Sequence, residues 1–325
     1  MIISRTPLRL SFVGGGTDFF DFYKNDGGAV MSATIDQYMY VTVNKRFDNG
    51  IRLSYSMTEI VEHVDQLKHE LIREAMKLTG VTEGIEITTI ADVPSRGTGL
   101  GSSSALTVGA LNALYAYKGV YASAERLARE ACRIEIDLLK QPIGKQDQYI
   151  AAYGGIQHIE FHPNEEVWVD PVMIPVEIRN RLDENLMLFF TGITRQAASI
   201  LVNQKAKIHQ NNGLLKQMRE QVAELRRCLC HGIKELDRFG QILHQNWLLK
   251  RRLADGISNG SIEGIYTRAR KAGAIGGKVA GAGGGGFLLL YCPKERQDSV
   301  RSALKEIKEL KFRFEPQGSK IVYVS

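Results

Sequence analysis

Three glycine-rich segments contain most of the residues in this chain whose types and spacing could do chemistry. They are residues 13–18 (VGGGTD), 97–104 (GTGLGSSS) and 281–286 (GAGGGG). A single segment of this kind is compatible with an ordinary turn. Glycine also lets the backbone come close to a bound group, because it carries no side chain. Three such segments in one chain therefore favour a ligand site over three unrelated turns.

The middle segment extends to residues 94–105 (PSRGTGLGSSSA) and lies between a predicted strand and a predicted helix. The first N–H groups of a helix have no partner within it, and the helix dipole is positive at that end. An anion fits there, and phosphate is the usual one. The hydroxyls of Ser102, Ser103 and Ser104 can bind phosphate oxygens or Mg²⁺, which prefers hard oxygen ligands. The segment thus predicts a phosphate site.

Two standard phosphate loops are excluded. A P-loop needs G-x-x-x-x-G-K-[ST], but the GGK of residues 276–278 is followed by Val279 and has Ala272 in place of the first glycine. A Rossmann fingerprint needs a strand before G-x-G-x-x-G. Gly281, Gly283 and Gly286 have that spacing but precede the predicted strand 287–291. We interpret this third segment as a close-packing turn that helps to shape the site.

Local patterns predict the elements that must position these segments. Residue types and periodicity predict strands over 1–13, 29–44, 85–93, 154–161, 186–191, 287–291 and 320–324. They predict helices over 59–79, 103–118, 123–140, 196–231, 233–255, 262–273 and 294–309. The chain becomes mostly helical after about residue 195. We therefore predict an α+β fold with two lobes and a cleft between them, divided into domains 1–185 and 186–325.

Bulk composition is that of an ordinary globular protein. The chain has 325 residues, of which 44% are hydrophobic and 24% charged, with a net charge of +6. Acidic residues are interspersed with the basic ones, and we interpret the basic run of residues 250–252 as a solvated helix face. No apolar run could span a bilayer, and neither a signal peptide nor a CxxC pair is visible. We expect a cytoplasmic protein, compatible with a homodimer, that binds neither nucleic acid nor membrane.

The three segments, in this order, resemble the three motifs of the GHMP kinase superfamily, which includes galactokinase, homoserine kinase and mevalonate kinase. The first motif resembles residues 5–18 (RTPLRLSFVGGGTD) and the third resembles residues 278–286 (KVAGAGGGG). The second, P-x-x-x-G-L-G-S-S-[AS], is matched by Pro94, Gly99, Leu100, Gly101, Ser102 and Ser103. The resemblance covers nearly the whole chain. It implies a two-lobed fold with the active site in the cleft, and it implies ATP and Mg²⁺ as cofactors.

Three further stretches narrow the resemblance. GGGTD followed by DFY, IGKQDQYIAAYGG, and TGITRQAASIL are similar to D-glycero-D-manno-heptose 7-phosphate kinases. This implies phosphorylation of the anomeric hydroxyl to give the 1,7-bisphosphate, a step toward nucleotide-activated heptose. A kinase of another sugar (fucose, galactose or arabinose) is the alternative on the same fold. A non-catalytic sugar or nucleotide sensor would be expected to lack acidic or metal-binding residues, and Ser103, Glu135 and Asp147 are all present.

The resemblance implies a metal and nucleotide site at the second segment. Ser103 would be one ligand of Mg²⁺ and Glu135, on the following helix, the other. Glu135 falls on the apolar stripe of its predicted helix, where a carboxylate is costly unless it is paired or bound to metal. A buried salt bridge is the alternative for Glu135, and a cap or packing role is the alternative for Ser104. The ATP-binding residues implied are Pro94, Gly97, Thr98, Gly99, Leu100, Gly101, Ser102, Ser103 and Ser104.

Asp147 matches the catalytic aspartate of the family. It would accept the proton of the sugar hydroxyl, or orient that hydroxyl for in-line attack on the phosphate. A nearby cation would keep the Asp147 carboxylate ionised. Arg9, at the family's Lys/Arg position, and Lys145, two residues from Asp147, are both candidates for that cation. A surface position is the alternative for Lys145.

The resemblance also implies residues that bind the substrate. Asp18 would accept hydrogen bonds from two vicinal hydroxyls, and Gly15 and Gly16 would let the sugar lie close to the backbone. Arg195 is the candidate for the remote phosphate of the substrate, because arginine binds phosphate with two parallel hydrogen bonds. An interdomain salt bridge is the alternative for Arg195, and Lys205 and Lys278 are weaker phosphate candidates. Substrate contacts are also expected at Asp147, Gly283 and Gly284.

Overall fold

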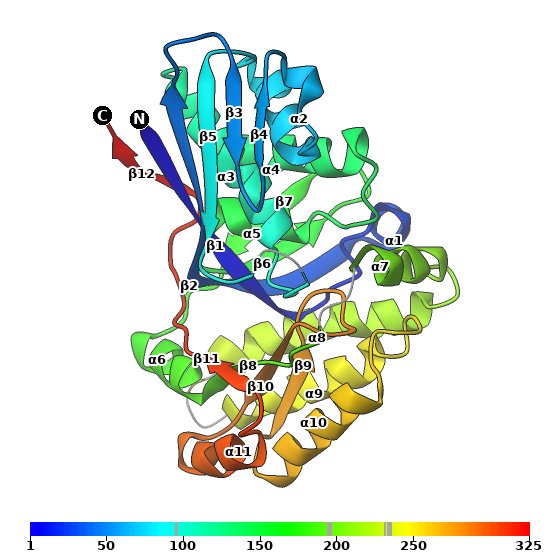
Figure 1. Ribbon diagram of the computed structural model, residues 1–325. Coiled ribbons are helices and arrows are strands. Elements are labelled where there is room, and N and C mark those ends of the chain that lie inside the picture. Colours follow the sequence, from blue (N-terminus) through cyan, green and yellow to red (C-terminus); the bar gives the residue numbers. More distant parts are fainter. Residues whose placement is uncertain (95–96, 194–196, 231, 233–235) are drawn as a thin grey trace.

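The computed structural model describes residues 1–94, 97–193, 197–230, 232 and 236–325. Figure 1 shows two lobes, each built around one sheet with helices packed on it. The upper lobe holds the larger sheet and most of the first half of the chain. The lower lobe holds the smaller sheet and the long helices. The predicted α+β, two-lobed fold is confirmed.

The larger sheet runs in the order β12-β1-β2-β5-β3-β4, with β6 paired to β2 and β7 to β6. Its centre is the antiparallel pair of β1 and β2, in which Arg9 lies opposite Thr34. Helix α3 packs on both of these strands. The strands are β1 (Ile2–Val13), β2 (Gly28–Lys45), β3 (Ile51–Ser54), β4 (Thr58–Val61), β5 (Ile85–Ala91), β6 (Ile156–Phe161), β7 (Val167–Pro171) and β12 (Lys320–Val324).

Two predicted helices of this lobe have other bounds in the structure, which also contains short helices over Phe20–Asp26 and Gln146–Tyr153 that were not predicted. The helix expected over 59–79 begins only at residue 70, because Thr58–Val61 forms the outer strand of a hairpin with β3. The helix expected over 123–140 is α-helical to Cys132 and then π-helical over Arg133–Leu138 (η2). The helices are α1 (Phe20–Asp26), η1 (Val64–Gln66), α2 (Glu70–Thr79), α3 (Ser102–Tyr117), α4 (Ala124–Cys132), η2 and α5 (Gln146–Tyr153).

The smaller sheet has the order β11-β8-β10-β9, and all its pairs are antiparallel. Its strands are β8 (Leu186–Phe190), β9 (Gly276–Val279), β10 (Phe287–Tyr291) and β11 (Lys308–Leu310). The helix predicted over 196–231 is two helices, and the one predicted over 294–309 ends at residue 303. The helices are α6 (Val176–Asn185), α7 (Ala197–Ala206), α8 (Asn212–Cys230), α9 (Leu236–Lys250), α10 (Gly260–Lys271), η4 (Lys294–Arg296) and α11 (Gln297–Ala303).

The last strand returns to the first lobe. β12 pairs with β1, so the two termini lie side by side in Figure 1. The second sheet begins at residue 186, where we placed the second domain, but the strand at 320–324 lies in the sheet of the first lobe. This strand therefore departs from the predicted domain 186–325. Among the described residues, none of the helices is long and apolar enough to cross a membrane.

One apolar core joins the lobes. The larger buried cluster extends from the first sheet into α8 and α9 of the second lobe. The rings of Phe12, at the end of β1, and Phe239, on α9, meet edge to face with centroids 5.2 Å apart. Because β1 leads directly into the first glycine segment, this contact fixes that segment relative to the second lobe.

Candidate active site

The second glycine segment forms a tight loop that leads into α3. Gly99 and Gly101 both have φ of +75°, a conformation that L side chains rarely adopt. A Cβ on Gly99 would lie 2.5 Å from the carbonyl oxygen of Ala280, on the third glycine segment. The loop therefore depends on glycine both for its own conformation and for its close contact with the other lobe.

Arg9 ties this loop to the central strand β1. Its backbone N–H donates to the carbonyl oxygen of Leu100 at 3.0 Å, and its Nη1 donates to the carbonyl oxygen of Gly99. Arg9 is only 5% exposed. The loop is thus held by a buried cation as well as by backbone hydrogen bonds.

Three serines in the first turn of α3 have different surroundings. Ser102 is buried, and its hydroxyl finds no hydrogen-bond partner among the described residues. Ser103 is exposed, whereas Ser104 is buried and donates to Glu135 at 2.7 Å. An unpartnered buried hydroxyl at a helix N-terminus fits a phosphate oxygen as acceptor. Ser104 instead has the packing role that was its alternative.

Glu135 is a completely buried carboxylate in the π-helical turn. It accepts hydrogen bonds from Ser104, from Thr107 at 2.5 Å and from Gln148 at 2.5 Å. Burial raises the pKa of Glu135 to about 7, although these three hydrogen bonds oppose the rise. These hydrogen-bond partners are neutral, and the described residues form no salt bridge with Glu135, which was the alternative considered for it.

Ser103 and Glu135 fit a Mg²⁺ ion by donor chemistry. Both present hard oxygens, and Ser103 adjoins the residue that binds the Glu135 carboxylate. Among the residues described, no group of three or more His, Cys, Asp or Glu side chains could by itself hold a metal ion. Magnesium sites in proteins commonly use one or two carboxylates and complete the octahedron with water and substrate phosphate. A site of that kind is compatible with these two residues.

Arg9 holds the carboxylate of Asp147 with two hydrogen bonds. Asp147 lies in the first turn of α5, where its two carboxylate oxygens accept from Arg9 Nε at 2.8 Å and Nη2 at 2.6 Å. Gln146 donates to Asp147 at 3.2 Å and accepts from Ser11 and Ser32 at 2.7 and 2.8 Å. This arrangement fixes the orientation of the carboxylate, and Arg9 is the cation that was predicted beside it.

Asp18, the last residue of the first glycine segment, lies next to the start of α5. Its carboxylate accepts from the backbone N–H of Gly16 at 2.8 Å and of Gln146 at 3.3 Å. Burial raises the pKa of Asp18, the Gly16 N–H lowers it, and the charge of Asp147 raises it further. A Cβ on Gly144 would lie 2.1 Å from Asp18 Oδ2, so the chain before α5 needs glycine there.

Asp18, Asp147 and Arg9 line one small cavity of about 90 Å³ between the lobes. Gly15 and Gly16 line it too, so the structure brings these five predicted site residues together. The sequence analysis missed four residues with polar or charged side chains that line it, which are Ser11, Gln146, Gln204 and Lys250.

The structure contradicts the prediction that Lys250 is exposed to solvent. The basic run 250–252 was interpreted as a solvated helix face, but Lys250 is 5% exposed and points into the cavity. The helical pattern correctly placed Arg251 and Arg252 in solvent. Lys250, which precedes these two arginines, points to a different side of the helix end. Its neighbours in sequence give no signal of this difference.

The third glycine segment packs closely against the second, as predicted. A Cβ on Gly281 would lie 2.6 Å from the Cα of Gly99. Gly281 and Ala282 line the cavity. Gly283 and Gly284, expected at the substrate, instead pack on Ile257, to whose carbonyl oxygen the Gly284 N–H donates at 2.8 Å.

Lys278 and Lys205, the weaker phosphate candidates, do not line the cavity. Lys278 is 1% exposed and donates to the carbonyl oxygen of Phe12 at 2.8 Å and to Asn246 at 3.1 Å, so it is a buried structural cation. Lys205 pairs with Asp21 at 3.7 Å. Arg195 lies outside the described residues.

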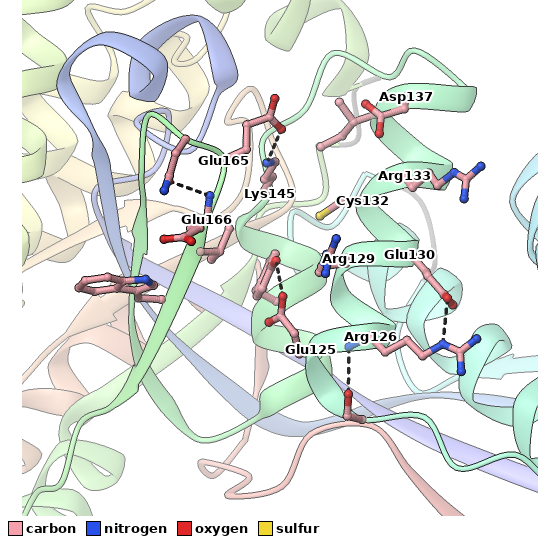
Figure 2. A pocket seen from close by; sticks show the side chains of 16 residues that line it. Glu125, Arg126, Arg129, Glu130, Cys132, Arg133, Asp137, Lys145, Glu165 and Glu166 are labelled. Atoms are coloured by element: carbon pink, nitrogen blue, oxygen red, sulfur yellow. Dashed lines mark hydrogen bonds and ion pairs between the residues drawn. The ribbon is translucent and has the colours of Figure 1, made fainter.

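Lys145 turns away from Asp147. Its ammonium lies 3.2 Å from Glu165 and 5.1 Å from the centre of the Tyr23 ring. Figure 2 shows this pair at the edge of a second, wider cavity of about 1060 Å³ between α4, the π-helical turn and the hairpin of β6 and β7. The expectation that Lys145 keeps Asp147 ionised is therefore not supported by the geometry, and Arg9 occupies that position.

Comparison with known proteins agrees with this geometry. Residues 62–155 match the GHMP kinases N terminal domain, and residues 218–309 match the GHMP kinases C terminal domain. A D-glycero-alpha-D-manno-heptose 7-phosphate kinase of Campylobacter jejuni is 32% identical over 320 residues, which cover 94% of each chain. A bifunctional fucokinase/GDP-fucose pyrophosphorylase of Arabidopsis thaliana is 26% identical over 92% of this chain and 31% of its own length.

A solved structure shares the whole fold. It is the crystal structure of a D-glycero-D-manno-heptose 1-phosphate kinase from Bacteroides thetaiotaomicron, with a TM-score of 0.83, 25% identity and complete coverage of both chains. Two domain matches in the right order and a relative 32% identical over nearly all of both chains lead to one conclusion: the protein belongs to the GHMP kinase family of enzymes.

Proposed function

We propose that this enzyme transfers the γ-phosphoryl group of ATP to the anomeric hydroxyl of D-glycero-D-manno-heptose 7-phosphate, giving the 1,7-bisphosphate. The observation that carries the proposal is the cavity in which Asp147, held by Arg9, lies beside Asp18. One carboxylate is positioned for the reacting hydroxyl, and the other faces the same space as a binder of neighbouring hydroxyls. The 32% identical relative from Campylobacter jejuni supports the choice of sugar.

The chemistry needs an oriented hydroxyl more than a strong base. In phosphoryl transfer the bond between the sugar oxygen and the γ-phosphorus forms while the bond from that phosphorus to the bridging oxygen of ADP breaks. Asp147 takes the proton of the sugar hydroxyl, and ADP leaves with the electron pair of the broken bond. Arg9 holds the carboxylate in a fixed orientation before the substrate arrives.

The triphosphate would lie along residues 97–104. The α3 N-terminus offers free N–H groups, and Ser102 offers a hydroxyl without a partner among the described residues. Mg²⁺ would be held by Ser103 and Glu135 and would neutralise charge on the phosphates when bound. The cavity is smaller than the roughly 300–1,000 Å³ of typical ligand pockets, so its walls must separate to admit the substrate.

The names of the relatives differ on the sugar. One is named for heptose 7-phosphate and another, a solved structure, for heptose 1-phosphate. We choose the 7-phosphate because that relative is the more similar in sequence. Fucose is the second candidate sugar, since fucokinase chains from Arabidopsis thaliana and Bacteroides fragilis are each 26% identical.

The test is ADP release measured across free sugars and sugar phosphates. Turnover with heptose 7-phosphate at a far higher kcat/KM than with fucose is expected. Fucose turnover without any heptose 7-phosphate turnover would establish the second candidate instead. Arg195→Ala tests the proposed remote-phosphate contact: KM should rise for the phosphorylated substrate only, and an equal rise for an unphosphorylated analogue would remove Arg195 from that role.

A further inference from the structure

Lys250, the last residue of α9, brings an amine to the catalytic cavity from the second lobe. Its Nζ donates to the carbonyl oxygen of Gly281 and, at 3.4 Å, to that of Val279. The side chain lines the same cavity as Arg9 and Asp147. Lys250 is thus a buried cation that faces the groups of the first lobe across the cleft.

The charge of Arg9 is already paired with a carboxylate inside the protein. Its Nε and Nη2 both donate to Asp147, and its Nη1 donates to the carbonyl oxygen of Gly99. An arginine has five N–H donors, so three of them have acceptors within the protein. Arg9, the cation that the family resemblance implies beside Asp147, therefore mainly positions Asp147 and the glycine loop.

Lys250 differs in this respect. Among the described residues it makes no ion pair with a carboxylate, and it donates hydrogen bonds to two carbonyl oxygens. A charged lysine has three N–H donors, so one remains for a ligand. The charged groups around it are Arg9 on β1, Asp18 after β1, Asp147 on α5 and Lys278 on β9.

We propose that Lys250 contacts the transferred phosphoryl group and neutralises the charge on its oxygens during transfer from ATP to the sugar. This inference rests on the proposed function, because it requires a phosphoryl group to pass the Asp147 carboxylate. That group must lie between the hydroxyl at Asp147 and the N-terminus of α3, which are close together because a Cβ on Gly101 would lie 3.4 Å from Asp147 Oδ2. Lys250, bound to Gly281, lines the same cavity as Asp147.

The pKa of Lys250 is consistent with this geometry. Burial, with a smaller contribution from the charge of Arg9, lowers the pKa of Lys250 to about 7, and the charges of Asp147 and Asp18 oppose the fall. Part of the Lys250 population is therefore a neutral amine before ligands bind. A phosphate at the cavity favours the charged form, so binding of ATP above pH 7 should draw a proton onto Lys250. The lysine keeps this proton throughout the reaction, since the proton of the sugar hydroxyl goes to Asp147.

A purely structural role is the competing explanation. Lys250 would then only brace the loop at residues 279–281 by donating to its carbonyl oxygens. The two roles differ in what the substitution Lys250→Met should change. A brace would alter stability and the affinity for both substrates, whereas a phosphoryl contact would alter the rate of transfer.

The first measurement compares Lys250→Met and Lys250→Arg with Arg251→Met. Arg251 adjoins Lys250 but is exposed and pairs with Glu263 at 2.9 Å, so it is a matched control outside the cavity. We expect Lys250→Met to lower kcat by on the order of 10²–10³-fold with KM for ATP changed far less. Lys250→Arg should recover part of the loss, and Arg251→Met should keep wild-type kcat. A Lys250→Met enzyme with wild-type kcat would overturn the proposal.

The second measurement needs no sugar, so it separates this proposal from the proposed function. ADP with Mg²⁺ and aluminium fluoride mimics a phosphoryl group in transfer. Calorimetry should show that aluminium fluoride tightens ADP binding to the wild-type protein and that Lys250→Met loses most of this gain while binding ADP alone normally. An equal gain in both proteins would overturn the Lys250 contact. Absence of turnover with every sugar would instead count against the proposed function alone.

Proton uptake provides the third readout. Titration with ATP at pH 8 in two buffers of different ionisation enthalpy should show more protons taken up by the wild-type protein than by Lys250→Met. Lys250→Gln serves if the methionine variant does not fold. Equal uptake would show that Lys250 is not protonated by the ligand and would contradict the proposed contact.

Discussion

The molecule has two cavities beside α5, and they differ in volume and in the burial of the charged residues that line them. The one between the lobes measures about 90 Å³ and is lined by buried charges, with Arg9 5% and Asp18 6% exposed. The groove between α4 and the hairpin of β6 and β7 measures about 1060 Å³ and is lined largely by exposed or half-exposed charged residues, which include the ion pair of Lys145 with Glu165 (Figure 2).

This difference indicates which of the two cavities is better suited to catalysis. A buried charge costs free energy unless it is paired or hydrogen-bonded, so a cluster of buried charges is retained only where it has a use. Exposed ion pairs contribute little to stability and tolerate substitution. We therefore expect the smaller cavity to be the functional one, although the groove offers more space.

The largest effect is expected from Asp147→Asn. The amide cannot accept the hydroxyl proton, and it leaves the Arg9 guanidinium without its carboxylate partner. We expect kcat to fall by on the order of 10³-fold or more, while ATP still binds. Steady-state kinetics and calorimetry with ATP provide the check. Retention of most of the wild-type kcat would remove Asp147 from the reaction and, with it, the contrast between the two cavities.

The next effect concerns the contact between the two glycine loops. Gly99→Ala should misplace the phosphate loop, because the new Cβ would meet the Ala280 carbonyl oxygen at 2.5 Å. A loss on the order of 10²-fold in kcat/KM for ATP is expected. Gly119→Ala is the matched control, because Gly119 has φ of +71° and no neighbour within 4 Å of its Cβ position. That control should cost about 1–2 kcal/mol of stability and leave kcat/KM unchanged.

Equal losses of kcat/KM in these two glycine variants would show that backbone strain, rather than the contact between the loops, explains the effect of Gly99→Ala. The free energy of unfolding of both variants, measured in urea, separates the strain that they share from the clash that only one of them has.

A smaller effect is expected on the pH dependence of stability. The pKa of Glu135 is raised from 4.5 to about 7, so between these values the folded state holds a proton that the unfolded state releases. Its contribution to stability is present below about pH 4.5 and is lost as the pH rises through about 7, by roughly 3 kcal/mol at most. Unfolding in urea without Mg²⁺ should show this decline in the wild-type protein and much less of it in Glu135→Gln. The same slope in both proteins would contradict the assignment.

The smallest effects are expected in the groove. Arg129→Ala and Glu165→Gln should leave kcat/KM within about twofold of wild type, because these side chains lie outside the catalytic cavity. Lys145→Met should cost far less than Arg9→Met, since Arg9 and not Lys145 holds Asp147. A loss of kcat/KM for Lys145→Met as large as that for Arg9→Met would show that Lys145 takes part in catalysis. It would contradict the proposed difference between the two cavities.

The sequence predicted the parts of the site that depend on local pattern. Glycine spacing marked the three loops, and the position of Glu135 on an apolar helical stripe predicted that it is buried. The pairing of Arg9 with Asp147 required the family resemblance, because these residues are 138 positions apart and meet only through the packing of α5 on β1.

Other features could not be predicted, because tertiary packing decides them. Lys250 and Lys145 each have ordinary neighbours in sequence, yet one ends in the cavity and the other at the groove. The return of β12 to the first sheet depends on pairing between the two ends of the chain, which no local pattern encodes. The π-helical turn at Glu135 was likewise hidden within an ordinary helical pattern.

One measurement tests the central claim most directly. Phosphorus NMR of a reaction containing the enzyme, ATP, Mg²⁺ and D-glycero-D-manno-heptose 7-phosphate reports which hydroxyl receives the phosphate. The account predicts a new phosphate on C1, produced by the wild-type enzyme and not detectably by Asp147→Asn. A phosphate on any other carbon, or the same C1 product from the Asp147→Asn enzyme at the wild-type rate, would contradict it.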